Sequence, residues 1–145
     1  MPEPLSQPIQ QALQTDAMHG RSDNVRGDVF SEFCPSRDVL KHVTSRWGVL
    51  LLVALGGGAH RFGELRRKVG GISEKMLGQT LQWLEQDGFV LRIVHPAQPA
   101  RVEYQLTPLG EELSRKLHDL ADWIEGNLDG ILVAQRQRRA AAAPV

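Results

Sequence analysis

Two short amphipathic segments flank a glycine turn, and two β-rich runs follow directly; this order constrains the fold more than any other feature of the chain. The first segment, RFGELRRKV, has three apolar residues at helical spacing. After the turn GGIS, Ser73 can cap a second helix, which we expect to reach about Asp87 and to end at Gly88. The apolar face of that helix comprises Met76, Leu77, Leu81, Trp83 and Leu84. Two helices joined by a short glycine turn are typical of a helix-turn-helix.

The two β-rich runs, FVLRIVH and RVEYQL, roughly alternate between apolar and polar residues and are separated by PAQPA. They predict a β-hairpin with a proline-stiffened tip. Upstream, Pro35 suits the first turn of a helix, and an almost wholly apolar helix is expected from about Trp47 to Leu55. We therefore predict a mostly α-helical (α+β) fold with a small β-hairpin, a winged helix-turn-helix with flanking dimerisation helices.

Apolar residues recur in steps of three or four after Thr107, which can cap a long helix. The series comprises Leu109, Leu113, Leu117, Leu120, Ile124, Leu128 and Ile131. Such a near-heptad stripe is too apolar for a lone exposed helix, so we expect it to pack against a partner subunit or against the first helix. The residues expected in a dimer interface are Leu113, Leu117, Leu120, Trp123, Ile124 and Leu128.

Composition divides the 145-residue chain into one domain with two tails. Residues 1–30 are rich in Gln, Pro, Ser and Asp and are expected to form a flexible arm. The winged helix-turn-helix domain with its C-terminal dimerisation helix is expected over 31–132, and 133–145 is a tail with no expected fold. No stretch approaches the roughly 20 apolar residues of a membrane span, and the first residues lack the pattern of a secretory signal, so a cytoplasmic protein is expected.

The inventory of residues favours binding over catalysis. No cluster of nucleophile and base, paired-acid motif or phosphate loop is apparent, so an enzyme is not expected. The five histidines lack ligand spacing and Cys34 is the single cysteine, so no metal, cofactor or intrachain disulfide is expected. The 17 basic and 17 acidic residues cancel, but residues 61–75 are locally basic, which suits either nucleic acid or a solvated face.

Together these pieces resemble an HxlR-type transcriptional regulator, a branch of the MarR-like winged-helix proteins. The matching stretches are CP at 34–35, RW at 46–47, RFGELRRKVGGISEKML at 61–77, LEQDGFVLR at 84–92 and RVEYQLTPLG at 101–110. The resemblance covers about residues 34–127. It implies a homodimer whose winged helix binds double-stranded promoter DNA, and some members of the family sense electrophiles or oxidants through a cysteine near the first helix.

The polar face of the helix over 73–87 is the candidate surface for reading DNA. Its residues are Ser73, Glu74, Lys75, Gly78, Gln79 and Gln82. Gln can bond adenine through two atoms, Lys serves guanine or phosphate, and Gly78 permits close approach. Glu74 could accept a hydrogen bond from cytosine or could simply favour the positive end of the helix. The alternative is that this face is only a solvated surface.

Arginines on both sides of this helix are candidate phosphate contacts. Arg61 and Arg66 lie on the preceding helix, which would cross the DNA backbone, although they could equally serve solubility. Arg101 in the hairpin is expected to reach a minor groove or a phosphate. Its alternative is an ion pair with Glu103 or Glu85.

Cys34 directly precedes Pro35 at a predicted helix start, with Arg37 close by in the sequence. A helix N-terminus and a cation both favour the thiolate and lower the pKa of a thiol, which suits reaction with a small electrophile or oxidant. The alternative is a small side chain buried in the core. We therefore predict a homodimeric, sequence-specific DNA-binding repressor that is switched by thiol modification; the alternative is a winged-helix module that binds protein and not DNA.

Overall fold

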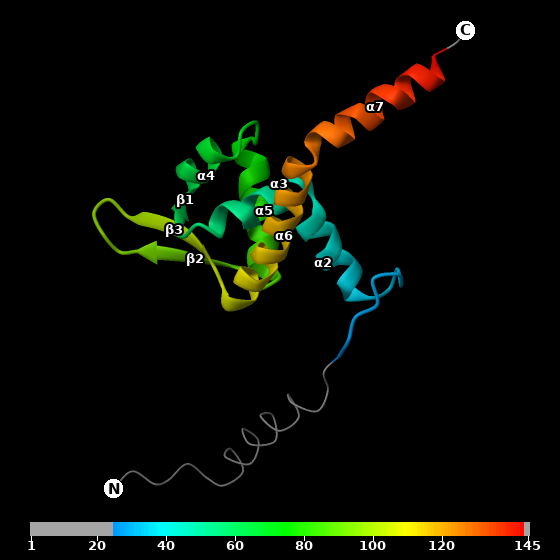
Figure 1. Ribbon diagram of the computed structural model, residues 1–145. Coiled ribbons are helices and arrows are strands. Elements are labelled where there is room, and N and C mark those ends of the chain that lie inside the picture. Colours follow the sequence, from blue (N-terminus) through cyan, green and yellow to red (C-terminus); the bar gives the residue numbers. More distant parts are fainter. Residues whose placement is uncertain (1–24, 144–145) are drawn as a thin grey trace, which may run out of the picture. The chain divides into compact units, whose positions relative to one another are not determined.

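The predicted winged helix-turn-helix is present in the computed structural model, which describes residues 25–143 (Figure 1). In chain order the elements are α2 (Pro35–Thr44), α3 (Arg46–Leu55), β1 (His60–Arg61), α4 (Phe62–Lys68), α5 (Glu74–Gln86), β2 (Val90–His95), β3 (Arg101–Leu106), α6 (Pro108–Gly126) and α7 (Leu128–Ala142). One unit of the chain ends at Arg37 and a second begins at Asp38. Most of the arm predicted over 1–30 lies outside the described residues.

The apolar core lies where α3 meets α4, α5 and α6. Leu51 and Leu52 of α3 are fully buried, and Leu65 of α4 and Leu77 of α5 pack with them. Other helices cover α3 on several sides, which is why its sequence is apolar nearly all round, as predicted. The two helices of the helix-turn-helix, α4 and α5, are thus both anchored on α3.

A three-stranded antiparallel sheet forms the wing, with the strand order β1-β3-β2. Strands β2 and β3 form the predicted hairpin, in which His95 lies opposite Arg101. Strand β1 was not predicted; it pairs with the other side of β3 and places His60 opposite Tyr104 and Arg61 opposite Glu103. Two residues are too few to show the alternation by which a strand is recognised in a sequence.

Helix α6 is fixed to the core by close backbone contacts at its start. As predicted, the Thr107 hydroxyl caps it, accepting from the Gly110 N–H at 3.0 Å. A Cβ atom at Gly110 would lie 2.0 Å from the carbonyl oxygen of Phe89, so only glycine fits there. One turn later the Ser114 hydroxyl donates to the carbonyl oxygen of Leu52 at 2.7 Å, which joins α6 to α3.

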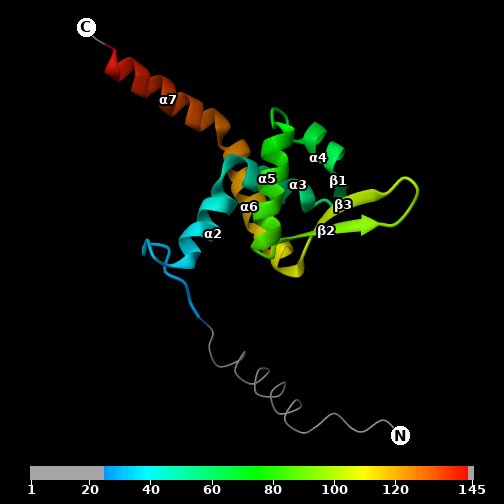
Figure 2. The same ribbon diagram turned by 180° about the vertical axis from the view of Figure 1, so that it is seen from behind.

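The prediction of one long C-terminal helix followed by an unfolded tail was wrong in two respects. The helix is interrupted at Asn127, whose backbone leaves the helical region and whose side-chain amide donates to the carbonyl oxygen of Trp123 at 2.7 Å. Beyond Asn127, α7 continues past residue 132, where the domain was predicted to end. It includes most of the tail predicted over 133–145, because alanine and arginine favour helix strongly. Figures 1 and 2 show α7 continuing outward from the end of α6. None of the described helices is long and apolar enough to cross a membrane.

The apolar face of α5 differs in detail from the predicted one. Leu77, Leu81 and Leu84 are buried as expected, but Met76 is exposed and Trp83 is only half-buried. Thr80 is buried in their place. Its hydroxyl donates to the Met76 carbonyl oxygen at 2.7 Å, so this polar group enters the core with its hydrogen bond made within the helix.

Candidate nucleic-acid interface

The polar face of α5 is open. Lys75, Gln79 and Gln82 are exposed, and no side-chain hydrogen bond or ion pair involves them in the described part of the chain. Gly78 lies between them, and a Cβ atom built on it would meet nothing within 4 Å. A donor-rich helix face with unoccupied side chains and a glycine gap can approach a major groove closely.

At the N-terminal end of α5, two of the predicted DNA contacts are already engaged. The Ser73 hydroxyl accepts from the Met76 N–H at 3.1 Å, which makes it the helix cap. Glu74 forms an ion pair with Arg66 of α4, with Oε1 2.7 Å from Nη1. Both side chains of this pair are half-exposed or more, so water and salt weaken it and phosphate can compete for the arginine.

The wing places Arg101 beside an acidic neighbour. Nε of Arg101 lies 3.1 Å from Oε1 of Glu103, so the predicted alternative of an ion pair with Glu103 is the arrangement observed. The two terminal nitrogens of the guanidinium remain for other partners. Both side chains of this ion pair are partly exposed, so phosphate can compete with Glu103 for Arg101.

Arg61 comes to the same side of the wing. Its backbone N–H donates to the Glu64 carboxylate at 2.9 Å, which fixes the start of α4. Arg61, His95 and Arg101 line an open groove of about 630 Å³ between the wing and the start of α4. The structure therefore brings together two of the predicted phosphate contacts, although they lie 40 residues apart in the sequence.

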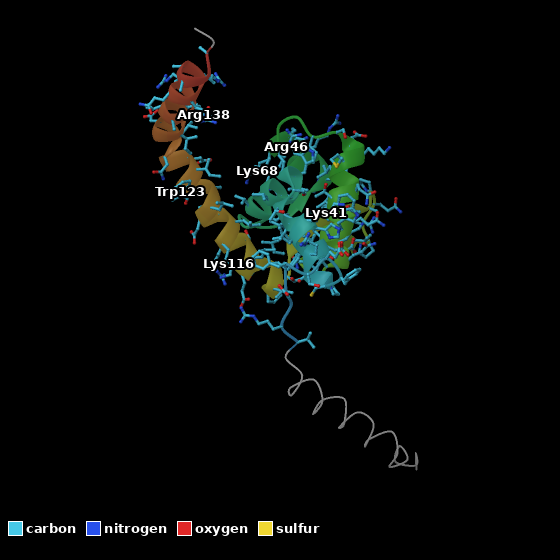
Figure 3. The ribbon with its side chains drawn as sticks, turned by 90° about the vertical axis from the view of Figure 1, so that its right-hand side faces the viewer. Lys41, Arg46, Lys68, Lys116, Trp123 and Arg138 are labelled. Carbon is cyan, nitrogen blue, oxygen red and sulfur yellow. The ribbon has the colours of Figure 1, made fainter. Side chains whose placement is uncertain are left out.

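Arg46 is a candidate contact that sequence reasoning missed. Its guanidinium stacks over the Trp47 ring at 4.3 Å, and the far edge of that ring lies 3.8 Å from the Cβ position of Gly71 in the turn of the helix-turn-helix. No ion pair to an acidic side chain holds Arg46 anywhere in residues 25–143. Figure 3 labels it. The dipeptide RW was the available signal in the sequence, because an arginine beside a tryptophan can stack its guanidinium on the ring and stay at the surface.

Cys34 belongs to the unit that ends at Arg37, and its thiol is polarised locally. The pKa of Cys34 is lowered, first by the Ser36 hydroxyl, which donates to Sγ at 3.1 Å, and then by the backbone N–H of Asp28 at 3.4 Å. The predicted direction is therefore confirmed. The predicted role of Arg37 was wrong, because its guanidinium donates to the carbonyl oxygens of Val29 and Phe30.

The predicted dimer stripe divides into a buried and an exposed part. Leu117 is buried in the core of its own protomer, and Leu113 packs against that core. The exposed part comprises Leu120, Trp123, Ile124 and Leu128. Leu132 and Val133 of α7, which were not predicted in the interface, are also exposed and extend this apolar stripe. Trp123, near the end of α6, is 61% exposed (Figure 3). A large apolar surface of this kind is typical of a protein–protein contact.

The described residues hold no group of three or more His, Cys, Asp or Glu side chains that could bind a metal ion. The open face of α5, the wing and the start of α4 together offer a surface for a macromolecule.

Comparisons with known proteins agree with this geometry. The model of the HxlR-like helix-turn-helix family matches residues 42–131. The chain is 64% identical over 114 residues to the uncharacterized HTH-type transcriptional regulator YtfH of Escherichia coli K12, which covers 79% of this chain and 90% of that protein. The solved structure of the putative transcriptional regulator ytfH from Salmonella typhimurium has a TM-score of 0.72 and 65% identity, covering 77% of this chain and 99% of the other. The redox regulator HypR in its oxidized form has a TM-score of 0.60 and 35% identity, covering 65% and 97%.

Proposed function

Because the chain belongs to the HxlR-like helix-turn-helix family, which consists of transcriptional regulators and not enzymes, we propose that it binds specific DNA sequences as a homodimer, with α5 as the recognition helix. The observation that carries this proposal is the open face of α5, where Lys75, Gln79 and Gln82 have no partner in the described part of the chain. Gln79 and Gln82 are suited to adenine, and Lys75 to guanine or phosphate. Arg61, Arg66 and Arg101 then contact the DNA backbone on either side.

The exposed apolar stripe supports the homodimer. Leu120, Trp123 and Ile124 on α6 and Leu128 on α7 would be covered in a two-fold contact between like surfaces. A dimer presents two copies of α5, which enter successive major grooves about one helical turn apart. The bound DNA is therefore a pseudo-palindrome, and a single half-site binds only weakly.

Cys34 supports a thiol switch on this regulator. Its lowered pKa increases the thiolate fraction near neutral pH, and a structural relative is itself named a redox regulator. A quinone adds to the thiolate sulfur, whereas peroxide oxidises it to sulfenic acid with release of water. Either product at the start of α2 disturbs the simultaneous docking of the two recognition helices, and the protein then dissociates from its promoter. In this proposal the protein is a cytoplasmic repressor.

Selection of bound duplexes from a random library, followed by footprinting, tests the proposal. We expect a pseudo-palindromic site whose two protected halves have centres about 10 base pairs apart. Recovery of sequences without any preference, at low as well as at moderate salt, would contradict specific DNA binding. It would favour the alternative of a winged helix that binds protein.

A further inference from the structure

Helix α7 exposes apolar side chains along its first half. None of its residues is buried, and it follows directly on α6 (Figure 1). Leu132 and Val133 are 41% and 42% exposed. A helix of 15 residues is only marginally stable in water unless packing covers an apolar face. The exposure of these residues therefore indicates that another helix covers α7 in the assembled protein.

The exposed side of α7 has a symmetric order of side chains. Leu132 and Val133 are adjacent; Asp129 lies three residues before Leu132, and Arg136 lies three residues after Val133. With 3.6 residues per turn, these four positions lie within about 100° of one another around the helix. All four are exposed. The order is symmetric about the midpoint between Leu132 and Val133, except that the charge changes sign.

The two charges have no partner within the described part of the chain. Neither Asp129 nor Arg136 forms an ion pair there. They are seven residues apart, about 10 Å along the helix, which is too far for pairing within α7. A second copy that runs antiparallel brings each acid onto a base. A parallel copy in register brings each charge onto its like, which is unfavourable.

We propose that α7 forms an antiparallel helix pair with α7 of a second copy, with the two-fold axis passing between Leu132 and Val133. This inference rests on the homodimer of the proposed function and gives its interface an orientation. Leu132 then faces Val133 of the partner subunit, and Asp129 faces Arg136 of the partner subunit, each contact occurring twice. A two-fold interface requires a surface that is complementary to itself, and this face of α7 is.

The pair continues the exposed apolar stripe of α6 and extends beyond the family match. The stripe reaches α7 at Leu128, and the family model ends at residue 131, before Leu132. In the antiparallel register, the partner's last helical turn runs beside the end of α6. That turn is the alanine run at 140–142, and small side chains let two helices approach closely.

Charge reversal in the full-length chain tests the pairing. Asp129→Arg and Arg136→Asp each convert two attractive contacts per dimer into two repulsive ones, so each should weaken dimerisation about tenfold at low salt. The double variant restores opposite charges and should dimerise like the parent. Sedimentation of a dilution series measures the dissociation constant of the dimer. Arg138→Asp makes the same change of net charge on the opposite side of α7, and it should leave this constant unchanged.

Single cysteines in a Cys34→Ser background test the orientation. Two copies of Leu132→Cys lie beside the two-fold axis and should be linked by a short bis-maleimide. Two copies of Ala140→Cys lie about 22 Å apart along the antiparallel pair and should stay unlinked. In a parallel pair, both variants would be linked to the same extent. Circular dichroism checks that each variant keeps its helices.

The outcomes separate the inference from the function beneath it. A monomeric parent contradicts the homodimer of the proposed function. A dimeric parent whose dissociation constant changes in neither single charge variant overturns the pairing of α7, and so does a double variant that is not restored. Efficient linking through Ala140→Cys overturns the antiparallel orientation. An Arg136→Asp protein that dimerises like the parent and binds DNA less tightly assigns this arginine to phosphate and also overturns the proposal.

Discussion

At the scale of single residues, Lys75 and Gln79 are one turn apart on the open face of α5 but should contribute differently to DNA binding. Lys75→Ala should weaken binding to all sequences and flatten the slope of log affinity against log salt by about 0.9, the loss of one phosphate contact. Gln79→Ala should instead alter sequence preference, at roughly 1–3 kcal/mol for one well-made base contact. Binding to selected and shuffled duplexes across a salt series measures both quantities. Gln86→Ala, at the end of the same helix, is the matched control, and equal behaviour of all three variants would remove α5 from the reading role.

The thiol of Cys34 provides a second prediction at this scale. The largest cause of its lowered pKa is the hydrogen bond from the Ser36 hydroxyl, so Ser36→Ala should raise the pKa toward the ordinary value of a cysteine. The rate of alkylation by iodoacetamide, followed against pH, should then show a midpoint at higher pH than in the parent. Arg37→Gln should leave the midpoint in place, because that guanidinium donates to backbone carbonyl oxygens and not to sulfur. A midpoint that moves only in Arg37→Gln would show that the arginine cation lowers the pKa of the thiol, as the sequence suggested.

The proposed switch is tested on the same thiol. Diamide or peroxide should release DNA from the parent, whereas Cys34→Ser should bind DNA and remain bound. The experiment is simple to interpret because Cys34 is the single cysteine, so any thiol product on the protein must be at this position. A treated parent that keeps its affinity, with modification of Cys34 verified by mass, would exclude a regulatory role for this residue.

At the scale of elements, one side chain joins α2 to the end of α5. His42 Nδ1 lies 2.6 Å from Oδ2 of Asp87, and the His42 ring stacks on Trp83 with centroids 5.2 Å apart. Both side chains of this contact are largely buried, so His42→Ala would leave the Asp87 carboxylate without its partner. We expect a loss of about 1–3 kcal/mol in the free energy of unfolding, measured with urea. His118→Ala removes a similar pair, with Asp122, that is mostly exposed, and it should cost about 0.5 kcal/mol or less. Equal losses would show that burial of the His42 pair contributes nothing.

Elements with a strong local signal were predictable, and those set by short pairings were not. The helix α5 was found because its cap at Ser73, its apolar spacing and Gly88 all agree, and Gly88 indeed has φ of 82°. Strand β1 was missed because it exists only through pairing with β3. The break at Asn127 was missed because the apolar steps continue across it, so a pattern of spacing alone cannot detect a helix end. The exchange of Met76 for Thr80 on the buried face depended on a hydroxyl bonding within its own helix.

The predicted interface residues show the same limit. The candidates on α5 and α6 were chosen from chemistry and spacing, but whether each side chain has a partner depends on the fold. Pairing of Arg66 with Glu74 depends on the turn between α4 and α5 and was not predicted. Pairing of Arg101 with Glu103 was one of the predicted alternatives, since the two residues are two positions apart on one strand. Arg46 was passed over because its position beside the turn at Gly71 appears only once Trp47 is packed.

At the scale of the whole molecule, the exposed apolar stripe on α6 and α7 predicts the oligomeric state. Leu120→Glu places a charge in the proposed interface, where burial without a partner costs several kcal/mol. Because Leu120 is 49% exposed in the single chain, this substitution should leave the protomer folded and prevent dimerisation. Light scattering should then give the mass of a monomer, and affinity for the selected duplex should fall sharply while the helical circular dichroism is kept. Leu117→Glu, at a buried position of the same helix, should instead unfold the chain. A Leu120→Glu protein that remains dimeric would place the interface elsewhere.

Helix α6 passes from the core to the exposed stripe without a linker, since Leu117 is buried and Trp123 is exposed on the same unbroken helix. Six residues of helix span about 9 Å, so the separation between one protomer's core and its partner is set by a rigid rod. In a dimer formed through this stripe, the two copies of α5 cannot adjust their distance to suit the DNA. Each added base pair between half-sites moves them apart by about 3.4 Å and rotates one by about 35° around the duplex. The protein should therefore reject binding sites that differ from its own only in the length of the central spacer, even when every contacted base is unchanged.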